Sequence, residues 1–267
     1  MPYQTIQSES NPKFKRWKKM AQSARAIRAE RATLAEGAHL AQTALERDIK
    51  VQAVLLRAKG LNNEAAALLE KFLQKGVQAF VLDSLLFDAI SPVEHGAGLM
   101  IEISLPTVQR PRAMPTDVLY LDGIQDPGNI GTLIRTAVAS GVHSIASSPE
   151  CAHFWSPKAL RAGMGAHFAA ALYENVKPQE LRELFDARIL AADARGGSDL
   201  YLSEGWEAGH TVWMMGSEGQ GLSQAALAVT DERLYIPIDH DCESLNVSAA
   251  AAVCLFEQRR RRLTQKR

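Results

Sequence analysis

Polar side chains follow three segments of the chain that have the composition of buried strands. Asn129 and Arg135 come after VLYLDGI, within QDPGNIGTLIR. Glu218 comes after TVWMM, within GSEGQGLS, and Ser244 and Asn246 come after RLYIPI, within DHDCESLN. In open parallel sheets, ligands bind beyond the carboxyl ends of the strands, where helix N-termini point their free N–H groups. Each loop alone also fits an ordinary capped helix or turn, but three such loops in one domain indicate a reaction site.

The first loop leads into an amphipathic helix. We expect Asn129 to cap this helix and the helix to run from Ile130, with Leu133 and Ile134 on its buried side. Arg135 lies about a turn and a half after Asn129 and off the centre of the apolar stripe. It is therefore either an ordinary surface arginine or a part of the reaction site.

The second loop is rich in glycine. Gly216, Gly219 and Gly221 allow tight curvature around the carboxylate of Glu218, before a helix that begins near Ser223. The spacing matches neither the dinucleotide fingerprint G-x-G-x-x-G nor a Walker loop, because no Gly-Lys-Ser/Thr follows. A backbone-lined pocket for a flat, largely uncharged ring is at least as well supported as a phosphate site.

The third loop leads into the final helix of the chain. We expect this helix to run from Leu245, with Ser244 as its cap and with Asn246 and Ser248 in its first turn. The alanines that follow let another backbone pack closely against the helix.

The chain divides into two regions that differ in their expected order of helices and strands, and the polar loops belong to the second. Residues 1–105 combine a basic, helix-forming stretch from Lys13 to about Arg31 with further helices and the strands VQAVLL, VQAFVLD and GLMIEISL, as in a small α/β domain. Residues 106–116, PTVQRPRAMPT, contain three prolines and no apolar period, which is typical of a linker. Residues 117–267 alternate strands with helices, which predicts an α/β domain with a mostly parallel sheet covered on both faces.

Charge and composition limit the classes of protein that fit. Of the 267 residues, 46% are hydrophobic, which is enough for a folded core. The 30 basic and 30 acidic residues balance, so any affinity for nucleic acid must come from local patches rather than from an overall field. Two basic runs are candidates, each with a solvated helix face or tail as the alternative. They consist of Lys13, Lys15, Arg16, Lys18, Lys19, Arg25, Arg28 and Arg31 near the start, and of Arg259, Arg260, Arg261, Arg262, Lys266 and Arg267 at the end.

The cysteines support neither a disulfide framework nor a metal site. Cys151, Cys242 and Cys254 stand far apart, without C-x-x-C spacing and without histidines at metal-ligand spacing. We therefore expect no metal and a reducing, cytoplasmic environment. The chain has no apolar run of membrane-spanning length, and its N-terminus lacks the apolar segment of a signal peptide, so we expect no contact with a membrane.

The three loops resemble the three motifs of the SpoU/TrmH branch of the SPOUT RNA methyltransferases. NIGTLIRTA resembles the first motif, N-x-G-x-x-x-R, and GSEGQGL resembles the second, G-x-E-x-x-G-L. The third motif is matched by IPI and ESLNVSAAAAVCLFE, and all three occur in the order of the family between about residues 117 and 262. SPKALRAGMGAHF is similar to the segment of the family between the first two motifs. The first hundred residues, with NPKFKRWKK and EGAHLAQTAL, resemble the ribosomal-protein-like substrate-binding domain of many members.

This resemblance implies properties that periodicity cannot give. It implies a deep trefoil knot in the C-terminal domain, although general rules on chain connections argue against knots. It also implies S-adenosylmethionine bound in a bent form inside the knot, and an obligate homodimer whose sites form at the interface. The implied reaction is methyl transfer to a ribose 2′-hydroxyl of ribosomal or transfer RNA, with ribosomal RNA favoured.

The resemblance also assigns roles to individual residues. The catalytic set that it implies is Asn129, Arg135, Glu218, Ser244 and Asn246. The cofactor-binding set is Met215, Gly216, Ile236, Leu245 and Asn246. One departure is His240, which stands where many members have a glycine; we expect an exposed loop histidine there rather than a catalytic one.

The chemistry of methyl transfer leaves the role of Arg135 open. The reaction is an in-line displacement, so the site must hold the hydroxyl oxygen opposite the leaving sulfur. Either Arg135 accepts the hydroxyl proton, or it binds the adjacent phosphate and stabilises developing alkoxide charge. The second role is physically easier because the pKa of a guanidinium exceeds about 12.

Three alternatives remain beside this interpretation. One is a catalytically silent RNA-binding or ribosome-assembly protein on the same scaffold, which the intact polar set argues against. Another is a base methyltransferase of a different SPOUT branch. The last, a nucleotide-dependent oxidoreductase, lacks its glycine fingerprint.

Overall fold

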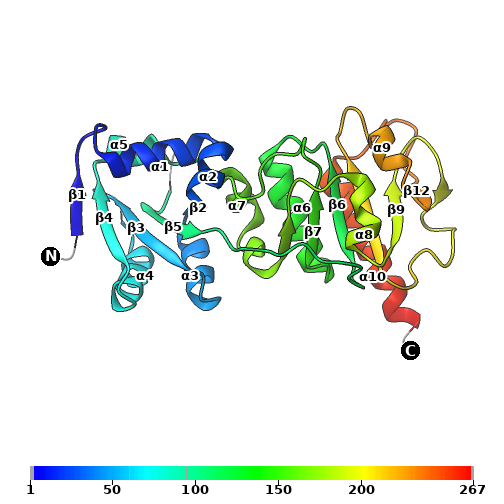
Figure 1. Cartoon of the computed structure of the whole chain (residues 1–267), viewed down its shortest axis with the longest axis horizontal. Coiled ribbons are helices and arrows are strands. Elements are labelled where there is room, and N and C mark those ends of the chain that lie inside the picture. Colours follow the sequence, from blue (N-terminus) through cyan, green and yellow to red (C-terminus); the bar gives the residue numbers. More distant parts are fainter. Residues whose placement is uncertain (1–2, 60, 94–95, 266–267) are drawn as a thin grey trace. The chain divides into compact units, whose positions relative to one another are not determined.

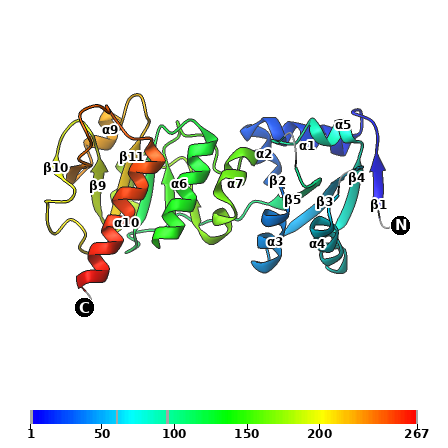
Figure 2. The same cartoon turned by 180° about the vertical axis from the view of Figure 1, so that it is seen from behind.

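The structure is a computed structural model that describes residues 3–59, 61–93 and 96–265. Contacts between residues divide the chain into two units. The first consists of Met1–Thr107 and Trp155–Phe168, and the second of Val108–Phe154 and Ala169–Arg267. Figures 1 and 2 show the elements of both units, coloured along the sequence.

The first unit is built on a mixed sheet. Within its described residues the strand order is β1-β4-β3-β5-β2, in which β1, β4 and β3 run parallel and β5 pairs antiparallel with both β3 and β2. The strands are β1 (Tyr3–Ile6), β2 (Ala32–Glu36), β3 (Val51–Arg57), β4 (Gln78–Leu82) and β5 (Leu99–Ser104). The helices are α1 (Pro12–Gln22), α2 (Ala24–Glu30), α3 (Ala38–Glu46), α4 (Asn63–Gln74), α5 (Ser84–Asp88) and α7 (Pro157–Gly163).

The basic N-terminal stretch forms two helices rather than one. Ser23 separates α1 from α2 with an extended backbone, and its hydroxyl caps α2 by accepting from the N–H of Ala26 at 3.4 Å. The buried face of α1 carries Phe14, Trp17 and Met20, at the three-residue spacing of an amphipathic helix. The basic residues of α1 lie away from this buried face.

Helix α7 packs within the first unit although it comes late in the sequence. The hydroxyl of Thr33, on β2, donates to the carbonyl of Trp155 at 2.7 Å, and both residues are buried. His39 lies 3.2 Å from the carbonyl oxygen of Met164. The segment around α7 therefore shares a core with β2.

The second unit is built on the mostly parallel sheet that the sequence predicts. Within its described residues, seven strands follow the order β10-β12-β9-β11-β6-β7-β8, and neighbouring strands pair in parallel. The strands are β6 (Val118–Asp122), β7 (Ser144–Ser147), β8 (Ala171–Tyr173), β9 (Arg188–Ala192), β10 (Ser198–Asp199), β11 (Thr211–Gly216) and β12 (Glu232–Tyr235). The helices are α6 (Pro127–Ser140), α8 (Leu181–Leu184), α9 (Gln224–Leu227) and α10 (Val247–Gln265), with a short 3-10 turn η2 (Pro178–Glu180). Another 3-10 turn, η1 (Ala166–Ala169), belongs to the first unit except for its last residue.

The two central strands bring the predicted loops together. Strands β6 and β11 are almost continuously buried, as expected for a parallel sheet covered on both faces. Their register aligns Gly216 with Asp122 at the carboxyl ends of the strands. The first and second loops therefore leave the sheet side by side. Helix α6 follows the first loop and packs against α10, the helix that follows the third loop (Figure 2).

Candidate active site

Helix α6 begins earlier than the sequence pattern indicates. Its first residue is Pro127, and Asp126 is the N-cap, whose carboxylate accepts from the N–H groups of Gly128 at 2.5 Å and Asn129 at 3.1 Å. The prediction that Asn129 caps a helix beginning at Ile130 is therefore wrong. Asp126 satisfies the free N–H groups at the start of the helix, so the carboxamide of Asn129 is available for other contacts.

Side chains from all three loops meet at the start of α6. The Asn129 amide donates to Oε1 of Glu218, and the Asn246 amide donates to the same oxygen at 3.4 Å. The Ser248 hydroxyl donates to Oδ1 of Asn129 at 3.4 Å, and the Asn246 amide lies 3.5 Å from that oxygen. The network fixes the orientation of the Asn129 carboxamide, because its amide must face the carboxylate and its oxygen must face the hydroxyl.

Asn246, rather than Ser244, caps the final helix. Helix α10 begins at Val247, and Oδ1 of Asn246 accepts from the N–H of Ser248 at 2.9 Å. The predictions that Ser244 is the cap and that the helix runs from Leu245 are therefore wrong. Ser244 instead lines a cavity beside the network.

The glycine-rich loop folds back on itself. Ser217 and Gly221 exchange backbone hydrogen bonds of 3.1 and 2.8 Å. A Cβ on Gly216 would lie 2.2 Å from the carbonyl carbon of Gly221, so only glycine fits there. The buried carboxylate of Asp122 accepts from the N–H of Ser223 at 2.7 Å. Helix α9 begins at Gln224, next to Ser223 as predicted, and the Ser223 hydroxyl caps it. This loop therefore holds Glu218 over the carboxyl ends of β6 and β11.

A cavity of about 360 Å³ lies beside this loop. Met215, Gly216, Ile236 and Leu245, all predicted to bind the cofactor, line it, whereas Asn246 is not among the lining residues. Leu234 and Val247 complete an apolar wall, and the polar lining residues include Asp193, Arg195, Glu218, Glu243 and Ser244. An apolar wall with a polar rim suits a ligand that has a flat ring and a charged end.

Arg135 lies outside the hydrogen-bonded network. Its side chain is exposed on α6, and within the described residues it makes no hydrogen bond or ion pair. The structure thus joins Asn129, Glu218 and Asn246 directly and places Ser244 on the cavity. It leaves the Arg135 guanidinium free to meet a phosphate or another anion.

His240 has the exposure expected of a loop histidine. Its side chain is 88% exposed and lies 3.2 Å from Asp239 and 3.3 Å from Asp241. It is not among the residues that line the cavity.

Sequence reasoning missed several residues that shape the site. Asp126 and Asp122 anchor the first two loops, and Arg195 lines the cavity from the turn after β9. The Asp-Pro pair at 126–127 is a recognisable helix start, because Asp favours the N-cap and Pro the first helical position. Nothing in the sequence around Arg195 marks it as a cavity residue.

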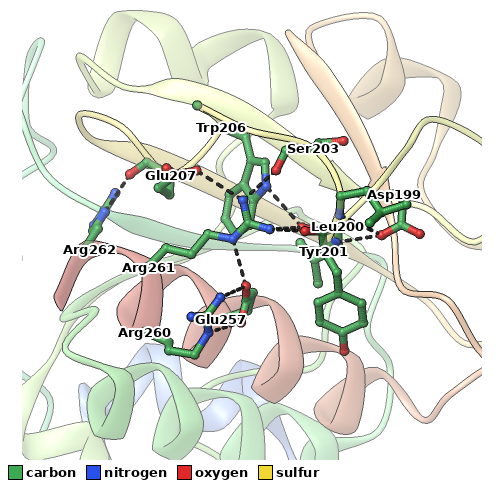
Figure 3. Close-up of polar contacts among 12 residues, drawn as sticks. Asp199, Leu200, Tyr201, Ser203, Trp206, Glu207, Glu257, Arg260, Arg261 and Arg262 are labelled. Carbon is green, nitrogen blue, oxygen red and sulfur yellow. Dashed lines mark hydrogen bonds and ion pairs between the residues drawn. The ribbon is translucent and has the colours of Figure 1, made fainter. Parts of the chain in front are cut away.

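The arginines at the end of α10 are structural rather than a free basic patch (Figure 3). The Arg261 side chain is only 12% exposed and lies 4.8 Å over the ring of Trp206. Its guanidinium donates to the carbonyl oxygens of Leu200 at 2.8 Å, Tyr201 at 2.7 Å and Ser203 at 2.5 Å. Arg261 therefore ties the segment after β10 to the helix and is not a free cation.

The neighbouring arginines are also bound. Arg262 pairs with Asp117 at 2.5 Å and donates to the carbonyl of Gly209 at 2.6 Å, and Arg259 donates to the carbonyl of Ser140 at 3.1 Å. Hydrogen bonds from Arg260, and then from Arg261, lower the pKa of Glu257 to about 2. Lys266 and Arg267 lie outside the described residues.

Part of the N-terminal basic run is also used internally. Arg16 donates to the buried carboxylate of Glu102 at 2.6 Å, and Lys18 pairs with Glu9 at 3.2 Å. Lys13 is exposed, and its ammonium lies 4.9 Å from the centre of the Phe80 ring. The exposed members of the run for which the described part of the chain offers no hydrogen-bond, ion-pair or aromatic-ring partner are Lys15, Lys19, Arg25 and Arg28.

A membrane-crossing helix would need a long apolar stretch. None of the helices formed by the described residues has the length and apolar content for it.

Comparisons with known proteins match both parts of the chain. Residues 117–256 match the SpoU rRNA Methylase family, and residues 11–100 match the MRM3-like substrate binding domain. A relative in Bacillus subtilis (strain 168), the 23S rRNA (guanosine(2553)-2′-O)-methyltransferase RlmP, is 29% identical over 254 residues. That match covers 95% of this chain and 98% of the relative.

Solved structures show the same fold. The SpoU methyltransferase AviRb from Streptomyces viridochromogenes, in complex with the cofactor AdoMet, superposes with a TM-score of 0.83 at 22% identity, over 95% of this chain and 99% of that chain. An AdoMet-bound rRNA methyltransferase from Sinorhizobium meliloti superposes with a TM-score of 0.83 at 22% identity, over 98% and 99% of the two chains. At this identity the likeness concerns the fold alone.

Proposed function

The chain belongs to the SpoU rRNA methylase family, and on this premise we propose that it transfers a methyl group from S-adenosylmethionine to a ribose 2′-hydroxyl of RNA, with ribosomal RNA favoured. The observation that carries the proposal is the meeting of Asn129, Glu218 and Asn246 from three separate loops. These residues lie at the carboxyl edge of a parallel sheet, beside a cavity that Glu218 also lines.

The cavity suits the proposed cofactor. Its volume of about 360 Å³ falls in the range of small-molecule sites. Met215, Ile236 and Leu245 offer an apolar surface for an adenine ring, while the missing side chain of Gly216 lets the glycine-rich loop close against its own backbone. S-adenosylmethionine would supply an electrophilic methyl group on a sulfonium at the polar side of this cavity.

The network would orient the RNA ribose for this transfer. Glu218, held by two amides, accepts hydrogen bonds and can direct a ribose hydroxyl, while Asn129 keeps the carboxylate in place. We assign Arg135 the role of binding the adjacent phosphate and stabilising the developing alkoxide.

The proposal includes a homodimer, in which two copies of the chain associate. Helices α6 and α10 pack against each other. Arg135 is exposed on α6, and α10 exposes Phe256, which is 45% exposed, and Leu263, which is 56% exposed. Exposed apolar side chains on α10 favour self-association, because burial removes them from water. A homodimer through this face would place Arg135 near the partner's surface. The deep trefoil knot expected from the resemblance is part of the same proposal.

The N-terminal region, up to about residue 105, is proposed to bind the RNA substrate. Its support is the match of residues 11–100 to a substrate binding domain. The exposed cations Lys15, Lys19, Arg25 and Arg28 of α1 and α2 would contact phosphates. We place the protein in the cytoplasm, because its proposed substrate is ribosomal RNA and its cysteines are free thiols.

Calorimetric titration with S-adenosylmethionine, followed by tritium transfer to deproteinised RNA, tests the proposal. We expect cofactor binding and transfer of label to RNA. Cofactor binding without transfer to ribosomal or transfer RNA would favour the silent RNA-binding alternative. Label on a base rather than on a ribose would assign the protein to another type of methyltransferase.

A further inference from the structure

The cavity beside the glycine-rich loop contains two charged side chains that the surrounding protein does not neutralise. Asp193 accepts from Arg233 at 2.6 and 3.0 Å, and Glu218 accepts from the amides of the network. Arg195 and Glu243 also line the cavity, yet among the described residues neither side chain has a hydrogen-bond or ion-pair partner. The cavity therefore presents one free positive and one free negative group.

The two groups come from different loops. Arg195 follows β9, and its backbone N–H is held by the Asp193 carboxylate at 3.0 Å. Its guanidinium lies over Gly221, since a Cβ built on that glycine would be 3.8 Å from the central guanidinium carbon. Glu243 lies in the loop before α10, next to Ser244. A ligand in the cavity can therefore meet a cation and an anion at once.

This pattern complements the free end of an α-amino acid, which carries a carboxylate and an ammonium on one carbon. Apolar residues form the remaining wall and suit the ring at the other end of the proposed cofactor. We propose that Arg195 binds the carboxylate and Glu243 the ammonium of the methionine end of S-adenosylmethionine. The inference rests on the proposed function and adds two residues that fix how the cofactor lies.

An RNA phosphate is a less suitable partner for Arg195. Arg195 also lines a larger neighbouring cavity of about 940 Å³, whose other charged residues are the acids Asp122, Asp126, Glu150 and Glu218 and one further cation, Lys177. The acids outnumber the cations on that side, which disfavours a phosphodiester there. The first cavity, with its apolar wall and its volume of about 360 Å³, suits a small molecule with a flat ring better than a polynucleotide.

Three probes that lose one group at a time test the assignment by calorimetric titration. S-adenosylmethionine has both charged groups, its decarboxylated analogue keeps only the amine, and 5′-methylthioadenosine has neither. Arg195→Ala should weaken S-adenosylmethionine about fivefold or more and leave the other two probes unchanged. Glu243→Gln should weaken both amine-containing probes by a similar factor and leave 5′-methylthioadenosine unchanged.

Controls keep the outcomes distinct. Lys177→Ala removes a cation that lines only the larger cavity, and it should change none of the three dissociation constants. Unchanged 5′-methylthioadenosine binding also shows that each variant is folded. An equal loss for all three probes, or unchanged S-adenosylmethionine binding with weakened RNA binding, would overturn the inference. Failure of the wild-type protein to bind S-adenosylmethionine at all would instead contradict the proposed function.

Discussion

The central residue pair of the site joins loops that are far apart in sequence. Asn129 and Glu218 are separated by 89 positions and are held together by a direct amide-to-carboxylate hydrogen bond. The types and spacing of these residues predict a shared site, but the partners of each side chain could not be predicted. Asn129 fits a helix cap by sequence. Only the bond that its backbone N–H donates to the Asp126 carboxylate shows that Asp126 is the cap and that the Asn129 side chain is available to Glu218.

Arg135 provides the most direct test at the residue scale. Arg135→Ala should lower the rate of methyl transfer at least about 100-fold, as expected when a group that stabilises charge in the transition state is removed. The dissociation constant for S-adenosylmethionine should not change, because Arg135 does not line the cofactor cavity. Single-turnover transfer and calorimetric titration measure the two effects.

Arg135→Lys is the matched control. It keeps a positive charge and should retain part of the activity if Arg135 stabilises charge. Full activity in Arg135→Ala would show that Arg135 has no part in the reaction.

The ionisation of Glu257 should make the free energy of unfolding depend on pH. Its hydrogen bonds from Arg260 and Arg261 lower its pKa from the ordinary 4.5 to about 2, so the folded state favours the charged carboxylate. The stabilisation is present above pH 4.5 and is lost as the pH falls towards 2. Urea unfolding should show wild type more stable than Glu257→Gln at neutral pH, with a difference that shrinks across this window. A difference independent of pH would show that this ion pair does not control acid stability.

At the scale of elements, α10 runs from the reaction site at the carboxyl ends of the strands to the opposite end of β6, where Arg262 pairs with Asp117. Its first turn carries Ser248 of the network, and its last turns carry the arginines that hold the segment from Leu200 to Glu207 (Figure 3). As a charge pattern the arginine run indicates a basic patch. The carbonyl oxygens and the Trp206 ring that receive these arginines come from distant segments, and no local pattern reveals them.

Arg261 should therefore be a stability residue. Arg261→Ala leaves the carbonyl oxygens of Leu200, Tyr201 and Ser203 without this donor, so we expect a loss of about 2–4 kcal/mol in the free energy of unfolding. Arg260→Ala is the matched control, because Arg260 is 63% exposed and should cost less than about 1 kcal/mol. Equal losses in urea titrations of the two variants would contradict this assignment.

The strands that the sequence pattern missed have either a helix-favouring composition or very few residues. β2 consists of ATLAE, whose alanines, leucine and glutamate favour helix, and it forms a strand because β5 pairs with it. β1, β8 and β10 have four, three and two residues and lie at or near sheet edges. Long buried strands such as β6 and β11 are visible in sequence because their apolar runs are bounded by turn residues.

At the scale of the whole molecule, RNA binding is assigned to the N-terminal region. Deleting residues up to Pro106 is a poor test of this assignment. Trp155 and its neighbours pack within the first unit, so the deletion would also remove their packing partners. Removing the free cations is a cleaner change. This change leaves Arg16 and its buried partner Glu102 intact.

The variant that replaces Lys15, Lys19, Arg25 and Arg28 by Gln should weaken RNA binding. The slope of log affinity against log salt should fall by about 3, the value expected for about four lost phosphate contacts. S-adenosylmethionine binding should remain unchanged. A control with Lys71→Gln and Lys75→Gln, at the end of α4, should alter the slope less. An unchanged slope in the fourfold variant would place the RNA-binding surface elsewhere.

The central claim is that the protein methylates a ribose hydroxyl in RNA. The measurement that tests it most directly is incubation of deproteinised ribosomal RNA with tritiated S-adenosylmethionine, followed by complete alkaline hydrolysis and separation of the products. A 2′-O-methyl group blocks cleavage of the adjoining phosphodiester, so the label should appear in alkali-resistant dinucleotides with wild type and be lost with Arg135→Ala. Label recovered only in mononucleotides would contradict the claim, because it would show that a base, not a ribose, had been methylated.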